Sequence, residues 1–312
     1  MSVDIAPALR VKGLRKSFGG VHALQDVDLA VGRGQVLGLL GQNGSGKSTL
    51  VKILTSVYAP DEGEVEVFGR RVALPSKDPK KTVIAVVHQD IGLEDTMTVF
   101  ENVESTVNFG TLPLLPIRHA REWARLEALR AELGIDVDLD VKVSSLSPAK
   151  RTFVGVLRAM RMLGNHGSET VLIMDEPTSS LSAPDARQVT SLLRRVADSG
   201  AGVMFISHRL GEVLDLCDSI TVLKDGKVTL AQATGDLSQA DLTQAMLGRR
   251  MDSFYPSRPA RVSSEPALVI QDLASAETVR GISLTIHKGE VVGLTGLTGM
   301  GHEEVPALLS GQ

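Results

Sequence analysis

The sequence predicts an α/β core built on a parallel or mixed sheet. Short apolar runs, typical of strands covered on both faces, alternate with helical patterns along the chain. The runs are Val36–Leu40, Val83–Val87, Val171–Met174 and Val203–Ile206. One helix, Lys47–Val57, begins directly after a glycine-rich loop, and another, Ala186–Ala197, follows a proline-containing start at Ser182–Asp185. This alternation of strands and helices indicates the α/β class.

Two smaller substructures are expected beside the core. Leu9–Val31 and Glu64–Val72 alternate apolar and polar residues between glycines, which predicts an antiparallel β subdomain. Arg118–Leu133 and Thr152–Leu163 have helical patterns, and they indicate a helical subdomain over about residues 92–165.

An internal repeat organises the chain into domains. Three pairs of glycines recur at one constant interval: Gly34 with Gly289, Gly41 with Gly296, and Gly46 with Gly301. A repeat of domain length indicates duplication. The stretch Met251–Pro266 is rich in Ser, Pro and Arg, as linkers are. We expect a first domain over residues 1–250, a linker over 251–266, and over 267–312 a fragment of a second domain, truncated before it can build a core.

Composition excludes several classes of protein. The net charge is −4 and the 33 basic residues are spread along the chain, which gives no footprint for nucleic acid. A signal peptide is not apparent, and no stretch approaches the ~20 apolar residues that span a bilayer. The single cysteine, Cys217, fits a reducing cytosol. Any role at a membrane is therefore expected to come through partners.

The glycine-rich loop has the pattern of a phosphate-binding loop. It consists of Gly41, Gln42, Asn43, Gly44, Ser45, Gly46, Lys47, Ser48 and Thr49, and it fits G-x-x-x-x-G-K-[ST] between an apolar strand and a helix. Glycines allow backbone N–H groups to approach a crowded phosphate chain, and the helix start adds a favourable dipole. Lys47 is expected to reach the β- and γ-phosphates, and the Ser48 hydroxyl is expected to bind Mg²⁺.

Three further positions predict hydrolysis rather than binding alone. Asp175 and Glu176 follow a buried strand; Asp175 is expected to hold Mg²⁺, and Glu176 to act as general base for the attacking water. His208 follows another strand and is placed to donate a hydrogen bond to the γ-phosphate. Gln89 is a weaker candidate to order the water and Mg²⁺.

In this order the motifs resemble the nucleotide-binding subunits of ATP-binding cassette (ABC) transporters. The resemblance implies a P-loop NTPase fold, with Gly41–Thr49 as the Walker A motif, Val171–Glu176 as the Walker B motif and its adjacent glutamate, Gln89 as the Q-loop and His208 as the switch histidine. It also implies that Phe18 stacks on the adenine of ATP.

Several strings look like those of tandem-cassette ATPases that import ribose, galactose or xylose: VVHQD, MTVFENV, FISHRL and MLGRRMDSFYP. This implies a peripheral protein on the cytoplasmic face of the membrane. Its expected partners are transmembrane permease subunits, indirectly a solute-binding protein, and a second cassette in the same or a partner chain. The apolar stretch Phe109–Pro116 is a candidate part of the surface that docks on the permease.

Two departures from the family pattern affect the expected activity. The signature segment reads Leu146-Ser147-Pro148-Ala149-Lys150, where Pro148 lacks a backbone donor. In the second phosphate loop, Gly296–Glu303, His302 and Glu303 stand where the first loop has Lys47 and Ser48. Because ABC cassettes pair head to tail, the resemblance implies that both defects fall on one site and leave the other hydrolytic.

Other functions stay open on the sequence alone. The main alternative is a regulatory or non-transport ABC-type module that binds ATP with little turnover. A soluble ABC protein of translation or DNA repair is expected to show a basic surface or long inserted arms, which this sequence does not. The second phosphate loop and the string MLGRRMDSFYP favour an importer over an exporter, and an Asn-Lys-x-Asp motif for guanine is not found.

Overall fold

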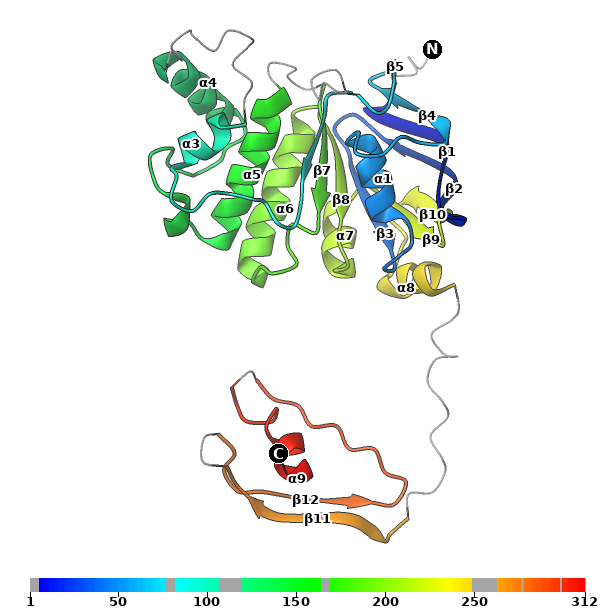
Figure 1. Cartoon of the computed structure of the whole chain (residues 1–312), viewed down its shortest axis with the longest axis vertical. Coiled ribbons are helices and arrows are strands. Elements are labelled where there is room, and N and C mark those ends of the chain that lie inside the picture. Colours follow the sequence, from blue (N-terminus) through cyan, green and yellow to red (C-terminus); the bar gives the residue numbers. More distant parts are fainter. Residues whose placement is uncertain are drawn as a thin grey trace. The chain divides into compact units, whose positions relative to one another are not determined.

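The computed structural model describes residues 6–76, 82–106, 119–163, 169–248, 263–275, 278–297 and 299–311 (Figure 1). The chain divides into two compact units, Met1–Met251 and Asp252–Gln312, which are described separately. The domain limits expected from the sequence, including the linker over 251–266, remain predictions, because residues 249–262 lie outside the described ranges.

A six-stranded sheet forms the centre of the first unit, in the order β10-β9-β3-β8-β7-β6. Its strands are β3 (Val36–Gly41), β6 (Ile84–Val87), β7 (Val171–Asp175), β8 (Gly202–Ile206), β9 (Ser219–Lys224) and β10 (Lys227–Ala233). Neighbouring strands from β9 to β6 pair in parallel, and β10 pairs with β9 in the antiparallel sense. The predicted α/β class with a mixed sheet is confirmed.

Both faces of this sheet are buried. Along β3, Val36 and Leu40 belong to the hydrophobic cluster that also includes residues of helices α5 and α6, whereas Leu37 and Leu39 belong to a second cluster with α1 and the antiparallel sheet. Side chains alternate between the two faces of a strand, so each strand contributes to both clusters. Figure 1 shows α5 and α6 on one side of the strands and α1 on the other. Because both faces of the sheet are covered, its strands are almost entirely apolar.

The predicted antiparallel subdomain is a four-stranded sheet in the order β2-β1-β4-β5. Its strands are β1 (Leu9–Phe18), β2 (Val21–Val31), β4 (Glu62–Val67) and β5 (Arg70–Val72). Helix α1 (Lys47–Leu54) packs in the same hydrophobic cluster. It ends three residues before the predicted Val57, because Ser56 adopts a left-handed backbone with φ of 65°, which a right-handed helix cannot contain.

Six more helices and a short 3₁₀ turn lie in the described part of the first unit. They are α3 (Val99–Glu104), α4 (His119–Glu132), the 3₁₀ turn η1 (Val143–Ser145), α5 (Pro148–Leu163), α6 (Ala183–Asp198), α7 (Leu210–Leu216) and α8 (Gln239–Leu247). The expected helices Thr152–Leu163 and Ala186–Ala197 therefore each begin one turn too late. Proline occupies the first turn of both α5 and α6, and the Ser182 hydroxyl caps α6 by accepting the N–H of Asp185.

Buried charges hold three helices of the helical region together. The Arg161 guanidinium of α5 donates to Glu104 of α3 at 2.7 Å and to Glu122 of α4 at 2.6 Å. Side-chain exposure is 11% for Arg161, 6% for Glu104 and 11% for Glu122. The stretch Phe109–Pro116, the candidate docking surface, lies outside the described residues.

The second unit contains an antiparallel strand pair, β11 (Pro266–Leu273) with β12 (Ile282–His287), and the short helix α9 (Val305–Ser310). Among the helices in the described ranges of both units, none has the length and apolar character needed to cross a membrane. Cys217, in the first unit, is buried, and burial raises the pKa of its thiol.

Replacing Arg161 by Met is expected to lower the free energy of unfolding by about 3–5 kcal/mol, because the buried carboxylate of Glu104 loses its partner. Arg125→Met is the control, since Arg125 pairs with the same Glu122 but its side chain is 42% exposed. That loss should stay below about 1 kcal/mol. Urea unfolding followed by far-ultraviolet circular dichroism measures both, and equal losses would contradict the proposed importance of the buried pair.

Candidate functional site

The polar residues predicted to act on ATP gather at one edge of the central sheet. Strands β3, β8, β7 and β6 are neighbours and run in parallel, so their carboxyl ends lie at the same edge. The phosphate loop follows β3, His208 lies two residues after β8, Glu176 follows β7, and Gln89 lies two residues after β6. Ligands bind at such edges in open α/β sheets.

The phosphate loop packs too closely for side chains at some of its glycines. Gly46 has φ of 109°, and a Cβ added there would lie 2.6 Å from the carbonyl oxygen of Ala23. Gly44 has φ of 80°, but a Cβ there would meet nothing within 4 Å. The Ser45 hydroxyl is buried and has no hydrogen-bond partner among the described residues. Glycine is thus required at Gly46 by both conformation and space.

Lys47 is the first residue of α1, and its side chain folds back over the loop. The Nζ atom donates to the carbonyl oxygens of Gly41 at 2.7 Å and of Gln42 at 2.9 Å. Burial lowers the pKa of the Lys47 ammonium, while the charges of Glu176 and Asp175 act in the opposite direction. The two acids thus lie near enough to Lys47 to influence its charge. Ser48 follows it on the exposed side of the helix start.

Phe18 ends β1, beside the turn Gly19–Gly20. Its ring is 42% exposed and packs edge-on against Tyr58, with 5.1 Å between the ring centroids. The Nζ of Lys16 lies 5.3 Å from the Phe18 ring centroid. One part of the ring is thus packed and another open to solvent, which is compatible with the predicted stacking on a base.

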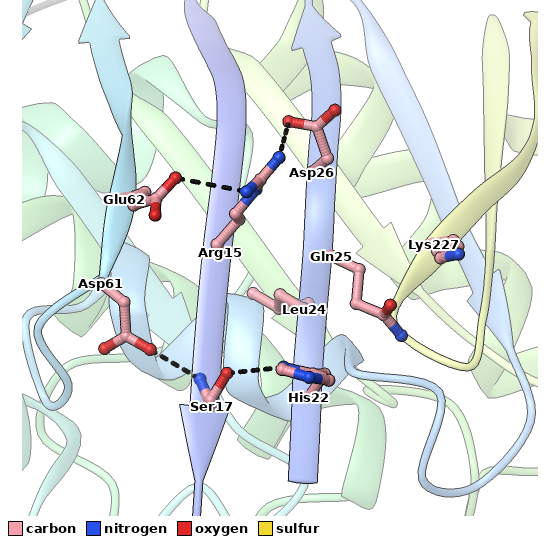
Figure 2. Close-up of a pocket in the computed structure, with 9 residues that line it drawn as sticks. All are labelled: Arg15, Ser17, His22, Leu24, Gln25, Asp26, Asp61, Glu62 and Lys227. Atoms are coloured by element: carbon pink, nitrogen blue, oxygen red, sulfur yellow. Dashed lines mark hydrogen bonds and ion pairs between the residues drawn. The ribbon is translucent and has the colours of Figure 1, made fainter. Parts of the chain in front are cut away.

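A hollow of about 520 Å³ lies on the antiparallel sheet, and its lining comes from β1, β2, the start of β4 and Lys227 of β10 (Figure 2). Several of its polar groups are paired with one another. Arg15 lies 3.6 Å from Asp26 and 3.4 Å from Glu62, and the Ser17 hydroxyl lies 2.9 Å from His22 Nδ1. The hollow is a mixed-charge surface of the β subdomain, and its lining does not include the predicted site residues.

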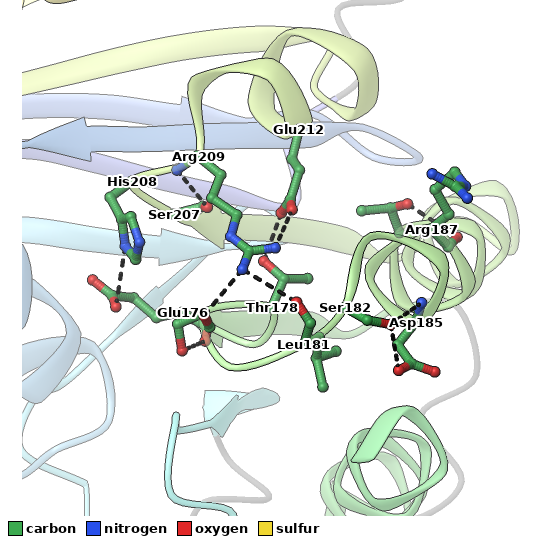
Figure 3. A network of polar contacts seen from close by, with 12 residues as sticks. Glu176, Thr178, Leu181, Ser182, Asp185, Arg187, Ser207, His208, Arg209 and Glu212 are labelled. Atoms are coloured by element: carbon green, nitrogen blue, oxygen red, sulfur yellow. Dashed lines mark hydrogen bonds and ion pairs between the residues drawn. The ribbon is translucent and has the colours of Figure 1, made fainter. Parts of the chain in front are cut away.

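Asp175 and Glu176 lie at the end of β7, each with a side chain about one third exposed or less. His208 Nδ1 lies 3.4 Å from Glu176 Oε2 (Figure 3). Glu176 adopts φ of 52°, a left-handed conformation that is unusual for a residue with a side chain. Its N–H donates to the Ile206 carbonyl of β8 at 2.9 Å. The structure therefore joins the expected base and the expected switch histidine directly.

Gln89 is exposed in the loop after β6. Its neighbour His88, not considered in the sequence analysis, places Nδ1 at 3.6 Å from Asp175 Oδ2. A group of three or more His, Cys, Asp or Glu side chains that could hold a metal by itself is not found within the described residues. Asp175 is therefore the central anionic candidate, with the oxygens of Ser48 and Gln89 as neutral candidates.

Sequence reasoning also missed a polar network behind this edge (Figure 3). The Arg209 guanidinium donates to Glu212 at 3.0 Å and to the carbonyl oxygens of Ser179 at 3.1 Å and Leu181 at 3.2 Å. Glu212 in turn accepts the Thr178 hydroxyl at 2.6 Å. The spacing of Arg209 and Glu212, three residues apart at a helix start, was the available signal.

The structure describes the residues that depart from the family pattern. Pro148 is the first residue of α5, where a missing N–H breaks no hydrogen bond within the helix, and Ala149 is fully buried. The Ser147 hydroxyl accepts the N–H of Lys150 at 3.4 Å. In the second unit, Glu303 is 68% exposed in its side chain and His302 lies 4.0 Å from it.

Comparisons with known proteins agree with this geometry. Residues 24–179 match the ABC transporter family. The ribose import ATP-binding protein RbsA of Corynebacterium glutamicum is 37% identical over 309 residues, covering 99% of this chain and 57% of the relative. A second ribose import ATP-binding protein, RbsA 3 of Rhizobium meliloti, is 36% identical over 302 residues, covering 96% of this chain and 58% of the relative. The chain thus spans somewhat more than half the length of these relatives.

Solved structures give the same fold. A nucleotide-free ATP-binding cassette from an ABC transporter superposes with a TM-score of 0.62 at 24% identity, covering 77% of this chain and 95% of the other. An ATP-binding cassette in its ADP conformation gives a TM-score of 0.64 at 24% identity, with 77% and 97% covered. With the match over residues 24–179, the fold and the site geometry lead to one conclusion: the chain is a member of the ABC transporter family.

Proposed function

We propose that this chain binds Mg-ATP at Gly41–Thr49 and hydrolyses it to energise import of a monosaccharide. One observation carries the proposal: Lys47, Asp175, Glu176 and His208 lie at one sheet edge, beside a glycine-rich loop that has no room for a Cβ at Gly46. The 3.4 Å contact between Glu176 and His208 supports a hydrolytic role rather than simple binding. The relatives are ribose import ATP-binding proteins, which supports the transport role.

The residues present fit a magnesium ion and a phosphate chain. Mg²⁺ prefers oxygen ligands and is commonly held by one or two carboxylates together with substrate phosphates. Asp175, Ser48 and Gln89 supply oxygens of this kind. The close packing at Gly46, where a Cβ would meet Ala23, is the feature expected of a backbone cradle for phosphate. Bound Mg²⁺ would supply electrostatic stabilisation of the phosphate oxygens.

In the proposed reaction, water attacks the γ-phosphorus of ATP. A water O–P bond forms, the bond from that phosphorus to the β-phosphate oxygen breaks, and ADP and phosphate leave. Glu176 accepts the proton of the water, and His208 donates a hydrogen bond to a γ-phosphate oxygen. Gln89 orients the water. Lys47 stabilises the charge that develops on the transferred group, and Phe18 stacks on the adenine.

Import of a sugar requires further proteins or domains beside this cassette. We propose permease subunits in the membrane, a solute-binding protein that delivers the sugar to them, and a second cassette in the same or a partner chain. The chain then sits at the cytoplasmic face of the membrane. In the fragment 267–312, His302 and Glu303 replace the lysine and serine of the first loop, so this second loop is expected to bind ATP poorly.

Glu176→Gln is expected to lower ATP turnover by about 10²–10⁴-fold while ATP still binds, because the glutamine cannot accept the proton of water. Lys47→Ala is the binding control, and it should weaken ATP affinity. Phosphate release by the complete transporter and binding of a fluorescent ATP analogue measure the two effects. Normal turnover by Glu176→Gln would instead favour the alternative, a regulatory ATP-binding module in which Glu176 is not the base.

Gly46→Ala is expected to weaken ATP binding by about tenfold or more, since the new methyl group must displace the Ala23 carbonyl or the loop itself. Gly44→Ala is the matched control, because it also has positive φ but has open space for a methyl group. Its loss should be clearly smaller. Titration with Mg-ATP by isothermal calorimetry compares the two, and equal losses would show that space at Gly46 is not what matters.

A further inference from the structure

The backbone at Glu176 is strained, and strain persists only where surrounding contacts hold it. Its φ of 52° is a left-handed conformation. Such a conformation is unfavourable for a residue with a side chain. If the backbone relaxed, the carboxylate would swing away from His208. The position of the proposed base therefore depends on whatever fixes the residues on either side of it.

Contacts on the carboxyl side of Glu176 come from the turn that follows. Ser179 donates to the Glu176 carbonyl twice, from its N–H at 3.3 Å and from its hydroxyl at 3.0 Å. Leu181 N–H donates to the Thr178 carbonyl at 3.1 Å, and Thr178 itself is fully buried. The turn over residues 178–181 thus holds the strained backbone of Glu176 on its carboxyl side.

Arg209 fixes this turn. One guanidinium nitrogen donates to the carbonyl oxygens of both Ser179 and Leu181, at 3.1 and 3.2 Å, and the other donates to Glu212 at 3.0 Å. Glu212 then accepts the Thr178 hydroxyl at 2.6 Å. The planar, multiply donating guanidinium suits this arrangement, which a lysine ammonium reproduces only in part.

The same arginine is attached to the loop that carries the histidine. Arg209 directly follows His208, and its backbone N–H donates to the Ser207 hydroxyl at 3.1 Å. Figure 3 shows the guanidinium lying between the β8 loop and the turn after Glu176. One residue therefore ties together the two loops whose side chains meet at 3.4 Å.

We propose that Arg209 is a positioning residue for hydrolysis, which holds Glu176 in its strained conformation through the turn over residues 178–181 and keeps it in register with His208. It acts through its neighbours and contacts neither the Glu176 carboxylate nor the loop Gly41–Thr49. This inference rests on the proposed function of Glu176. It predicts that Arg209 affects the chemical step and leaves ATP binding unchanged, because the phosphate loop lies on a different strand.

The test compares Arg209→Met, Arg209→Lys and Arg187→Met in the complete transporter, with Glu176→Gln as reference. Arg187 is the matched control, an exposed arginine near the same turn (Figure 3). Arg209→Met is expected to lower kcat by about tenfold or more with KM for ATP within about twofold, since small displacements of a catalytic group have large effects. Arg209→Lys should recover part of the rate, and Arg187→Met should retain all of it.

Three results would overturn the inference. One is a kcat of Arg209→Met within about twofold of wild type while Glu176→Gln is inactive. Another is a loss of kcat matched by equal losses of ATP affinity and thermal stability, which would mark a merely structural role. The third is full activity of Glu176→Gln, which overturns the function of Glu176 as well. If Arg209→Met does not fold, Glu212→Gln serves instead, with a smaller loss of kcat expected and the same outcomes decisive.

Discussion

The parallel pairing of β3, β8, β7 and β6 determines where the site residues of the first unit lie. In that register, each of these strands delivers its chain end to the same sheet edge, so a loop of glycines, a histidine, two acids and a glutamine become neighbours although they are far apart in sequence. The register itself depends on burial of both sheet faces. Side chains that alternate between two hydrophobic clusters would all change faces if a strand slipped by one residue.

The parts of this architecture that sequence could predict are those with strong local patterns. The strands β3, β6, β7 and β8 are short apolar runs, and the ends predicted for them are within one residue of those in the structure. The phosphate loop was identified by glycines that a close approach requires. Helix limits were predicted less accurately. Ser182 and Pro184 were recognised as the start signal of α6, but the helix itself was predicted to begin one turn too late. Strands β9 and β10 and helices α3, α7 and α8 were not predicted, although α3 and α8 carry a local signal: Thr98 with Glu101 and Ser238 with Asp241 form capping boxes at their starts.

Contacts between distant side chains were the least predictable part of the site. The sequence indicated that Glu176 and His208 belong to one reaction, but not that they touch. The strained backbone of Glu176 is held by its N–H, which donates to the Ile206 carbonyl, and by Ser179, which donates to the Glu176 carbonyl; no local pattern encodes these hydrogen bonds. Arg209 was not among the site residues predicted from the sequence. Its proposed role depends on the carbonyl groups that the fold places around its guanidinium.

The two hydrogen bonds of Lys47 have a consequence for which ions the loop accepts. Its ammonium donates two of its three hydrogens to the carbonyl oxygens of Gly41 and Gln42, so an anion that draws Lys47 fully toward itself must replace these two bonds. A polyphosphate presents several charged oxygens at once and compensates readily. A small monovalent ion offers little in return for two good hydrogen bonds. We therefore expect Lys47 to favour an anion of high charge density, such as a polyphosphate, over a small monovalent ion.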